Sequence, residues 1–280
     1  MPVIYIYLLT EMMIIMALSS RTLNPKRVHI APVGFEIDRV VIPAIQMDAD
    51  KLYLIIDKDE NDKGVYCVNE IKNQLSQREK GLEIIEVKTD FRRLELYDAL
   101  KIYRTILMDE KENHIFINVS TGSKIHSIAG MMTSMIFKED HISILPYYVQ
   151  PEKYELEPEH GEQLTRGCKG IQILPEYRIE KPSDGLLRVL DLINKNMEYD
   201  ADGDSRGINK KRLIAILNKE KISLIEDPVK NEVPAKYRAL ERRYIDPLLK
   251  WKYIRIEKRN RKAMIHVKKE GKDALHFLCD

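Results

Sequence analysis

The stretch INVSTGSKIHSIAG at residues 117–130 joins the end of a β-strand pattern to the start of a helical pattern. Between the two patterns lies STGSK, the small polar and basic residues 120–124. Such residues pack poorly in a core, but at a helix N-terminus their hydroxyls, the free N–H groups and the helix dipole attract an anion. The stretch therefore predicts a phosphate-binding turn between a buried strand and a helix. The alternative is a plain helix N-cap, which one Ser or Thr would satisfy.

This turn departs from the common nucleotide-binding motifs. Its spacing is not the GxxxxGK[ST] of a P-loop, and a second candidate loop, APVGFE at residues 31–36, is not GxGxxG. The sequence therefore predicts neither ATP hydrolysis nor a nicotinamide cofactor, and we expect no cofactor apart from a regulatory ligand.

Strand and helix patterns alternate around this stretch, from residue 27 to residue 180. We expect strands at 27–33, 51–57, 83–90, 114–120, 142–149 and 170–179, and helices at 35–47, 63–78, 91–110 and 124–138. The last helix is expected to bury Ile125, Ile128, Ala129, Met132 and Ile136. Single helices between strands predict an α/β fold with a doubly wound, Rossmann-like parallel sheet, in which ligands bind at the carboxyl ends of the strands. Both candidate loops fall at that edge.

A different pattern begins near residue 181 and continues to residue 280. We expect helices at 182–196, 210–222 and 234–254, a polar loop at 198–209, a strand–turn–strand hairpin at 254–269 and a closing helix at 270–278. Three helices followed by a two-stranded hairpin predict a winged helix-turn-helix domain.

The basic residues are placed unevenly, although the net charge of the chain is only +2. Residues 236–272 hold 14 Lys or Arg and four Asp or Glu, a net charge of +10, which leaves −8 for the rest. A basic block on a helix and a hairpin tip is typical of nucleic-acid binding; the alternative is a solvated charged face. The residues expected to contact DNA are Lys236, Tyr237, Arg238, Arg242, Arg243, Lys258, Arg259, Arg261 and Lys262. Those expected in the core of this region are Leu240, Ile245, Leu248, Leu249 and Trp251.

Composition indicates a globular protein, because 44% of the residues are hydrophobic and can form a core. Cys67, Cys168 and Cys279 are odd in number and far apart, which predicts neither a disulfide framework nor a metal site and fits a reducing cytoplasm. Residues 1–26 form an apolar extension that we expect outside the fold. It is short for a bilayer span and interrupted by Glu11, so we expect no membrane association; a membrane anchor is the alternative.

Residues 27–44, RVHIAPVGFEIDRVVIPA, and 118–130, NVSTGSKIHSIAG, followed by a winged helix, resemble the CRISPR-associated Rossmann fold (CARF) regulators. The resemblance covers residues 27–278 and is closest to an archaeal branch of CARF–winged-helix transcriptional regulators. It implies a homodimer whose paired sensor domains form one pocket, and double-stranded DNA as a partner. It also implies a ligand of the cyclic oligoadenylate class, such as cyclic tetra-adenylate, or a similar phosphorylated molecule.

The resemblance also implies roles for particular residues. By position, the ligand contacts would come from Gly34, Phe35 and Glu36 in the first loop and from Ser120, Thr121, Gly122, Ser123 and Lys124 in the second. Glu36, an acid beside a polyanionic ligand, would cap the helix or bind a ribose hydroxyl. Lys252 occupies a position where glycine is common, so the turn into the wing is expected to differ.

The predicted function is a ligand-responsive, DNA-binding transcriptional regulator, with a CARF-like sensor domain at 27–180 and a winged helix at 181–280. The alternative is a CARF-family effector enzyme, a ring nuclease or ribonuclease acting on cyclic oligoadenylate or RNA. For ring cleavage, Lys124 or Ser120 would stabilise developing charge. Neither loop holds a histidine, and His126 is expected at the surface. Arg261 and His266 fit the spacing of a ribonuclease motif, but that motif needs a helix and they fall in a hairpin.

Overall fold

The computed structural model describes residues 24–78, 81–91, 93–141, 143–155, 163–175, 177–199, 205–225, 230–259 and 262–279. Most of the predicted apolar extension, residues 1–23, lies outside these ranges. The chain divides after Ile179 into two compact units, and each is described by itself.

The first unit is built on a six-stranded sheet with the order β3-β2-β1-β4-β5-β8. Its strands are β1 (Arg27–Pro32), β2 (Lys51–Asp57), β3 (Glu83–Thr89), β4 (His114–Asn118), β5 (Ser143–Gln150) and β8 (Gly170–Ile173). The first five strands are parallel, and β8 is antiparallel to β5 at one edge. This topology confirms the predicted doubly wound sheet. The strand order reverses between β1 and β4, which is where ligands bind in such folds.

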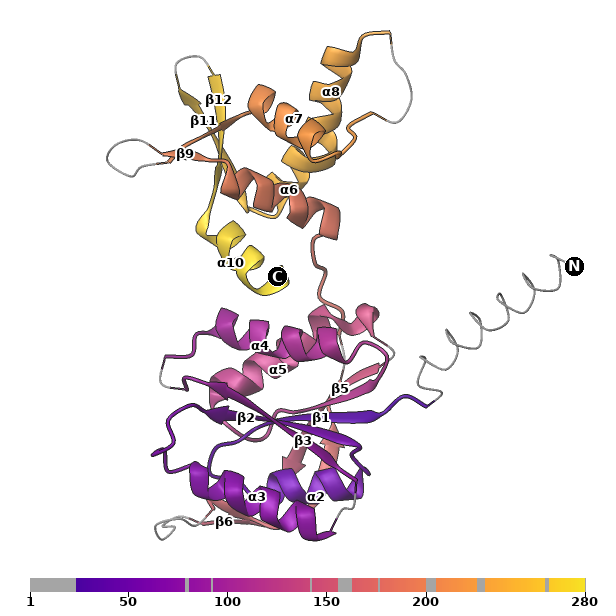
Figure 1. Cartoon of the computed structure of the whole chain (residues 1–280), viewed down its shortest axis with the longest axis vertical. Coiled ribbons are helices and arrows are strands. Elements are labelled where there is room, and N and C mark those ends of the chain that lie inside the picture. Colours follow the sequence, from indigo (N-terminus) through magenta and orange to yellow (C-terminus); the bar gives the residue numbers. More distant parts are fainter. Residues whose placement is uncertain are drawn as a thin grey trace, which may run out of the picture. The chain divides into compact units, whose positions relative to one another are not determined.

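Helices cover both faces of this sheet (Figure 1). On one face lie α2 (Asp38–Gln46) and α3 (Val65–Arg78), and on the other lie α4 (Leu96–Asp109) and α5 (Lys124–Ile136). A short 3-10 turn, η1 (Lys138–Asp140), follows α5, and a small hairpin of β6 (Lys153–Tyr154) and β7 (Thr165–Arg166) contacts α2. The apolar runs of β1 and β2 are buried because both faces are covered.

The predicted inner face of α5 is partly wrong. Ile128 is 48% exposed, whereas the buried residues of the helix include His126, Ala129 and Gly130. Small residues face the sheet because the approach is close: a Cβ added to Gly130 would lie 2.9 Å from Cγ2 of Ile117. The large apolar side chain of Ile128 is therefore left outside.

The second unit is a winged helix, as predicted. Its elements are α6 (Asp184–Lys195), β9 (Glu198–Tyr199), β10 (Ser205–Asn209), α7 (Lys210–Lys219), α8 (Glu232–Leu240), a π-helical turn η2 (Glu241–Ile245), α9 (Asp246–Lys250), β11 (Ile254–Arg259), β12 (Lys262–Val267) and α10 (Lys269–Leu278). The sheet has the order β11-β12-β10-β9. The polar loop expected at 198–209 was wrong where β9 and β10 form: β10 pairs with β12, so tertiary pairing overrides a sequence rich in Asp and Gly.

The core of this unit gathers residues from every helix and from the hairpin. Leu240, Ile245 and Leu248 are buried as expected, and Trp251 is partly buried against it. Leu249 is 37% exposed, so its prediction as a core residue was wrong.

The turn into the wing keeps the backbone that glycine favours. Lys252 adopts a left-handed φ of 59°, and its N–H donates to the Leu249 carbonyl at 2.9 Å. The expectation that lysine here changes the turn is therefore wrong.

Within the described ranges, no helix is both long and apolar enough to cross a membrane.

Candidate functional site

The two candidate loops meet at a pair of glycines. A Cβ added to Gly34 would lie 3.3 Å from Cα of Gly122. Gly122 has a φ of +73°, and a Cβ added there would lie 2.6 Å from Cβ of Pro32. Only glycine combines this conformation with this close approach. The structure thus brings together, at the carboxyl ends of β1 and β4, the two loops that carry all eight predicted ligand residues.

A buried asparagine at the end of β4 shapes the second loop. Oδ1 of Asn118 accepts hydrogen bonds from the Ser120 N–H, at 2.9 Å, and from the Ser120 hydroxyl. Its Nδ2 donates to the carbonyl of Arg39 in α2 at 2.8 Å. Asn118 therefore ties this loop to the helix that follows the first loop. Sequence reasoning missed it, although an asparagine closing an apolar strand is a signal.

Ser123 caps α5 together with His126. Its hydroxyl accepts from the His126 N–H and lies 2.9 Å from His126 Nδ1, while its own N–H donates to that nitrogen at 3.3 Å. Against expectation, His126 is not at the surface: it is 1% exposed and its ring lies 4.4 Å from that of Phe91. Burial lowers the pKa of His126 to about 4, so the ring is neutral at pH 7.

Two other polar side chains of the second loop, those of Thr121 and Lys124, take no part in capping α5. Thr121 is 2% exposed, and its hydroxyl has no hydrogen-bond partner in the described part of the chain. Lys124, the first residue of α5, is exposed and has no ion-pair partner there either. Because a buried hydroxyl without a partner costs free energy, this arrangement favours a bound acceptor atom. An anion at the N-terminus of α5 would supply one.

Glu36, in the first loop, has partners within the protein. Its carboxylate accepts a hydrogen bond from the hydroxyl of Thr165 and pairs with Arg39, with 3.9 Å between nitrogen and oxygen. Burial raises the pKa of Glu36. The side chain is 12% exposed, so most of it is turned into this contact. Phe35, its neighbour, is exposed.

A segment far along the chain holds the first loop in place. We call the described residues 151–155 and 163–169 the arm. The Gln163 side-chain oxygen accepts from the N–H groups of Ile37 and Asp38, at 3.0 and 2.9 Å. In addition, the N–H of Leu164 donates to the carbonyl of Phe35 at 2.9 Å. Gln163 thereby occupies the N-terminus of α2. Sequence reasoning missed the arm, because these partners lie more than 120 residues apart.

The residues predicted to contact DNA lie on two parts of the second unit. Arg238, Arg242 and Arg243 are exposed along α8 and η2, while Tyr237 and Lys236 are half-buried and Lys236 pairs with Glu232 at 2.9 Å. In the hairpin, Lys258 is exposed on β11, and Arg259 and Lys262 occupy paired backbone positions at the tip. Arg261 lies outside the described residues.

His266 is not placed as a ribonuclease histidine. It is buried in β12, its Nε2 lies 3.5 Å from a carboxylate oxygen of Glu257, and its Nδ1 lies 3.2 Å from the hydroxyl of Ser205. Across the described ranges, no group of three or more His, Cys, Asp or Glu residues could hold a metal ion.

Two family models match the chain. Residues 27–154 match the model HFX_2341_N-like, N-terminal, and residues 186–278 match the DUF6293 C-terminal winged helix domain. These matches confirm the predicted winged helix, and they show that a separate N-terminal family model matches the domain before it. An uncharacterized protein of Methanocaldococcus jannaschii, MJ1513, is 29% identical over 239 residues, which cover 77% of this chain and 68% of that protein.

Solved structures of longer proteins are more distantly similar. Can2 from Sulfobacillus thermosulfidooxidans, in complex with cyclic tetra-adenylate, is 14% identical with a TM-score of 0.37 over 90% of this chain and 63% of that chain. Csm6 from Enterococcus italicus, bound to cyclic hexa-2′-fluoro-hexa-dAMP, is 13% identical with a TM-score of 0.38 over 81% and 56%. The chain spans less than two thirds of the length of either protein.

Proposed function

Because the chain joins an HFX_2341_N-like N-terminal domain to a DUF6293 C-terminal winged helix domain, we propose that it is a ligand-responsive, DNA-binding transcriptional regulator. One observation carries the ligand-responsive part: among the residues that the structure describes, the buried Thr121 hydroxyl has no partner, and Lys124 at the N-terminus of α5 has no ion-pair partner. Such a site suits phosphate oxygens. Together with the CARF resemblance of the two loops, it supports a cyclic oligoadenylate, and we choose cyclic tetra-adenylate for the test.

The outer face of α5 supports a homodimer. Ile128 is exposed there, and Ile125, Met132 and Met135 are half-buried. An apolar stripe that begins at the ligand loop fits contact with a second copy. If the two-fold axis of the dimer passed through this stripe, two Lys124 side chains would lie around one ligand. Each chain would then supply half of the site.

The second unit supplies the DNA-binding part of the proposal. Its helix α8 and turn η2 present Arg238, Arg242 and Arg243, and its wing presents Lys258. In a winged helix this helix enters the major groove and the wing contacts the backbone. Ligand binding to the dimer would shift the spacing of the two winged helices toward or away from that of the operator half-sites.

Calorimetric titration of the full chain with cyclic tetra-adenylate tests the ligand. We expect one ligand per two chains and a loss of affinity of about tenfold or more in Lys124→Ala, since a charge-assisted hydrogen bond contributes about 1.5–3 kcal/mol. Lys111→Ala, an exposed lysine at the opposite edge of the sheet, is the matched control. Equal binding by both variants would contradict the assigned site.

DNA binding and catalysis are tested on the same samples. Arg242→Ala should weaken binding to operator duplexes and reduce the dependence of affinity on salt. Chromatography of the ligand after incubation tests the alternative of a ring nuclease. Linear products that form in proportion to wild-type protein, and not with Lys124→Ala, would favour the enzyme over the regulator.

A further inference from the structure

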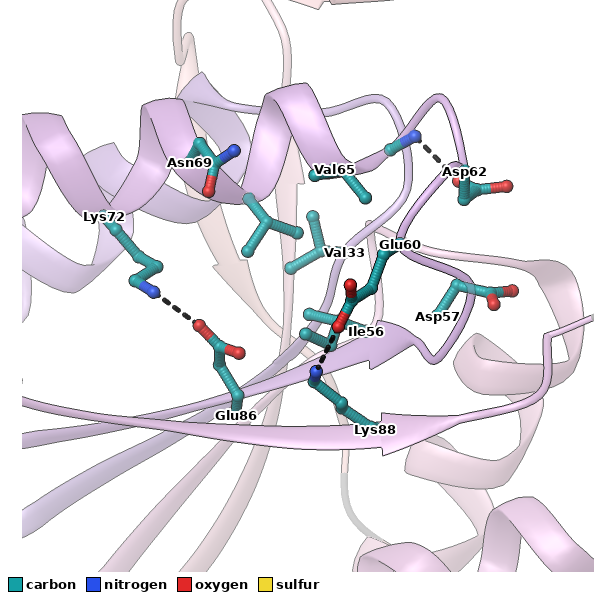
Figure 2. A pocket seen from close by; sticks show the side chains of 12 residues that line it. Val33, Ile56, Asp57, Glu60, Asp62, Val65, Asn69, Lys72, Glu86 and Lys88 are labelled. Carbon is teal, nitrogen blue, oxygen red and sulfur yellow. Dashed lines mark hydrogen bonds and ion pairs between the residues drawn. The ribbon is translucent and has the colours of Figure 1, made fainter.

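The two outer strands of the six-stranded sheet, β3 and β8, differ in the side chains that they carry. On β3 the charged side chains are held in ion pairs: Glu86 pairs with Lys72 at 2.5 Å, and Lys88 pairs with Glu60 at 3.4 Å. Figure 2 shows both ion pairs beside the pocket that lies between α3 and β3. Charged side chains on an outer strand hinder the addition of another strand. The β3 edge is therefore protected against pairing with a second protein.

Strand β8, at the opposite edge of the sheet, has the uncharged sequence GIQI, and its Ile173 is 48% exposed. The strand is antiparallel to β5, and the Leu174 N–H donates to the carbonyl of Pro146 in β5 at 2.9 Å. Because backbone groups alternate in direction along a strand, Gln172 also faces β5. The N–H and C=O groups of Ile171 and Ile173 face the other way, and no strand in the described part of the chain pairs with them.

We propose that β8 pairs with the β8 strand of a second copy of this chain, antiparallel and across a two-fold axis at Gln172. This register places Ile171 of each chain opposite Ile173 of the other. Residues that face each other in this way exchange both of their N–H···O=C hydrogen bonds. The outward backbone groups of Ile171 and Ile173 then all have partners, which the isolated sheet does not give them.

The sequence of the strand favours a second copy as the partner. Ile-Gln-Ile reads the same in both directions, so isoleucine meets isoleucine and Gln172 meets its own copy. Apolar side chains directly opposite each other stabilise an antiparallel pair, and the like charges that would destabilise it are absent from β8. Pro175 has no N–H, so the ladder ends after Ile173. Because a two-fold pair closes on itself and the β3 edge is protected, the sheets join in pairs and do not continue into a fibre.

This interface goes beyond the proposed function and uses a different surface from the outer face of α5. Strand β8 lies at the edge of the sheet, whereas α5 covers one of its faces (Figure 1). If both contacts form, two dimers make a tetramer, and if only β8 pairs, the protein is a dimer. In either case, breaking the β8 pair halves the number of chains in the particle. Its test therefore needs neither the ligand nor DNA.

Disulfide formation tests the register. Opposite residues that do not exchange hydrogen bonds have Cα atoms about 4.5 Å apart, which a disulfide can span. In the full chain, with the partly exposed Cys168 and Cys279 replaced by serine, Gln172→Cys should therefore form a disulfide-linked pair of chains under mild oxidation. Lys169→Cys, at an exposed position in the same background, is the matched control. It should stay reduced, because its two copies would lie about 20 Å apart along the paired strands.

Proline substitution tests the hydrogen bonds. Ile173→Pro removes an N–H that faces away from β5, so the sheet within each chain should stay intact while light scattering shows a loss of half the particle mass. Ile173→Val keeps the N–H and should keep the wild-type mass. Ile173→Lys leaves the backbone unchanged and places a charge in the pair, so it should also halve the mass if proline unfolds the strand.

An unchanged mass in Ile173→Pro and Ile173→Lys, with equal cross-linking of Gln172→Cys and Lys169→Cys, would overturn the β8 interface and leave the proposed regulator standing. A disulfide confined to Gln172→Cys, in a protein that binds neither cyclic tetra-adenylate nor duplex DNA, would support the interface and sink the proposed function.

Discussion

A buried acid at the amino edge of the six-stranded sheet and a buried hydroxyl at its carboxyl edge differ in their hydrogen bonding. At the amino edge, Glu110 is 3% exposed and accepts hydrogen bonds from Lys51, Tyr53 and Asn113 at 2.8, 2.6 and 2.6 Å. At the carboxyl edge, the hydroxyl of Thr121 has no hydrogen-bond partner within the ranges that the structure describes. A satisfied network stabilises the fold, whereas a buried hydroxyl without a partner costs free energy that a ligand acceptor atom would recover. The contrast predicts a loss of stability when Glu110 is removed and a loss of ligand affinity when the Thr121 hydroxyl is removed.

The largest effect is expected at the amino edge. Glu110→Ala removes the acceptor of three hydrogen bonds and leaves Lys51 without its buried partner. We expect a loss of about 3 kcal/mol in the free energy of unfolding of the first unit, with little change in ligand affinity. Urea unfolding and calorimetry measure the two quantities. Glu112→Ala, at an exposed acid in the same turn, should change neither the free energy of unfolding nor the ligand affinity. A comparable loss of stability in this control would contradict the role assigned to the Glu110 hydrogen bonds.

The two buried histidines and Glu110 should also affect stability in different pH ranges. Burial lowers the pKa of His126 to about 4, so the unfolded chain takes up its proton first and stability falls as pH drops from 6.5 toward 4. His29, which is buried in β1 with a pKa of about 3, adds to the same fall. Burial alone would raise the pKa of Glu110, but its hydrogen bonds from Lys51 and Tyr53 outweigh this and lower it. Its stabilisation is therefore lost only below about pH 4.5.

His126→Gln isolates the contribution of the carboxyl edge. Glutamine does not titrate, so the decline in stability between pH 6 and 4.5 should become shallower, by up to about 1.4 kcal/mol per pH unit. Glu110→Ala should keep the wild-type slope in this range. Unfolding curves at several pH values measure both slopes, and an unchanged slope in His126→Gln would show that the ring is protonated in the folded protein.

At the carboxyl edge, the expected effect is on binding. Thr121→Val keeps the shape of the side chain and removes only a hydroxyl that has no partner in the described part of the chain. We therefore expect the free energy of unfolding to stay within about 0.5 kcal/mol or to rise. Affinity for cyclic tetra-adenylate should fall about tenfold. Thr105→Val, on an exposed position of α4, is the control. Loss of stability without loss of affinity would mean that Thr121 belongs with the structural groups.

Much of the fold could be predicted because local signals were strong. Continuous apolar runs marked β1 and β2, and the Ser, Thr and Gly residues after β4 marked a turn at the switch point. The inner face of α5 was only partly predicted, because periodicity cannot tell which of two apolar stripes packs on the sheet. Close approach at Gly130 decided it in favour of the small residues. Strand β10 was missed because its pairing with β12 comes from tertiary structure.

The candidate site could also be predicted only in part from the sequence. The two loops were found from residue types alone, since hydroxyls, glycines and a lysine before a helix have a local meaning. The pocket beside α3 was not predicted, because its rim joins residues of β2, α3 and β3 that only the fold brings together. The contact between Glu36 and Thr165 was missed for the same reason, because the two residues are 129 positions apart in the sequence.

The smallest effect is expected at Gln163, through which the arm supports the first loop at the carboxyl edge of the sheet. Gln163→Ala removes the acceptor for two N–H groups at the start of α2, which should cost about 1 kcal/mol of stability. Because the arm also holds Phe35, ligand affinity should fall two- to threefold as the first loop loosens. Gln172→Ala, exposed on β8, should change neither quantity. If Gln163→Ala lowers stability but leaves ligand affinity unchanged, the arm affects stability alone, as Glu110 does. The carboxyl edge would then hold both residues that affect stability and residues that affect ligand binding.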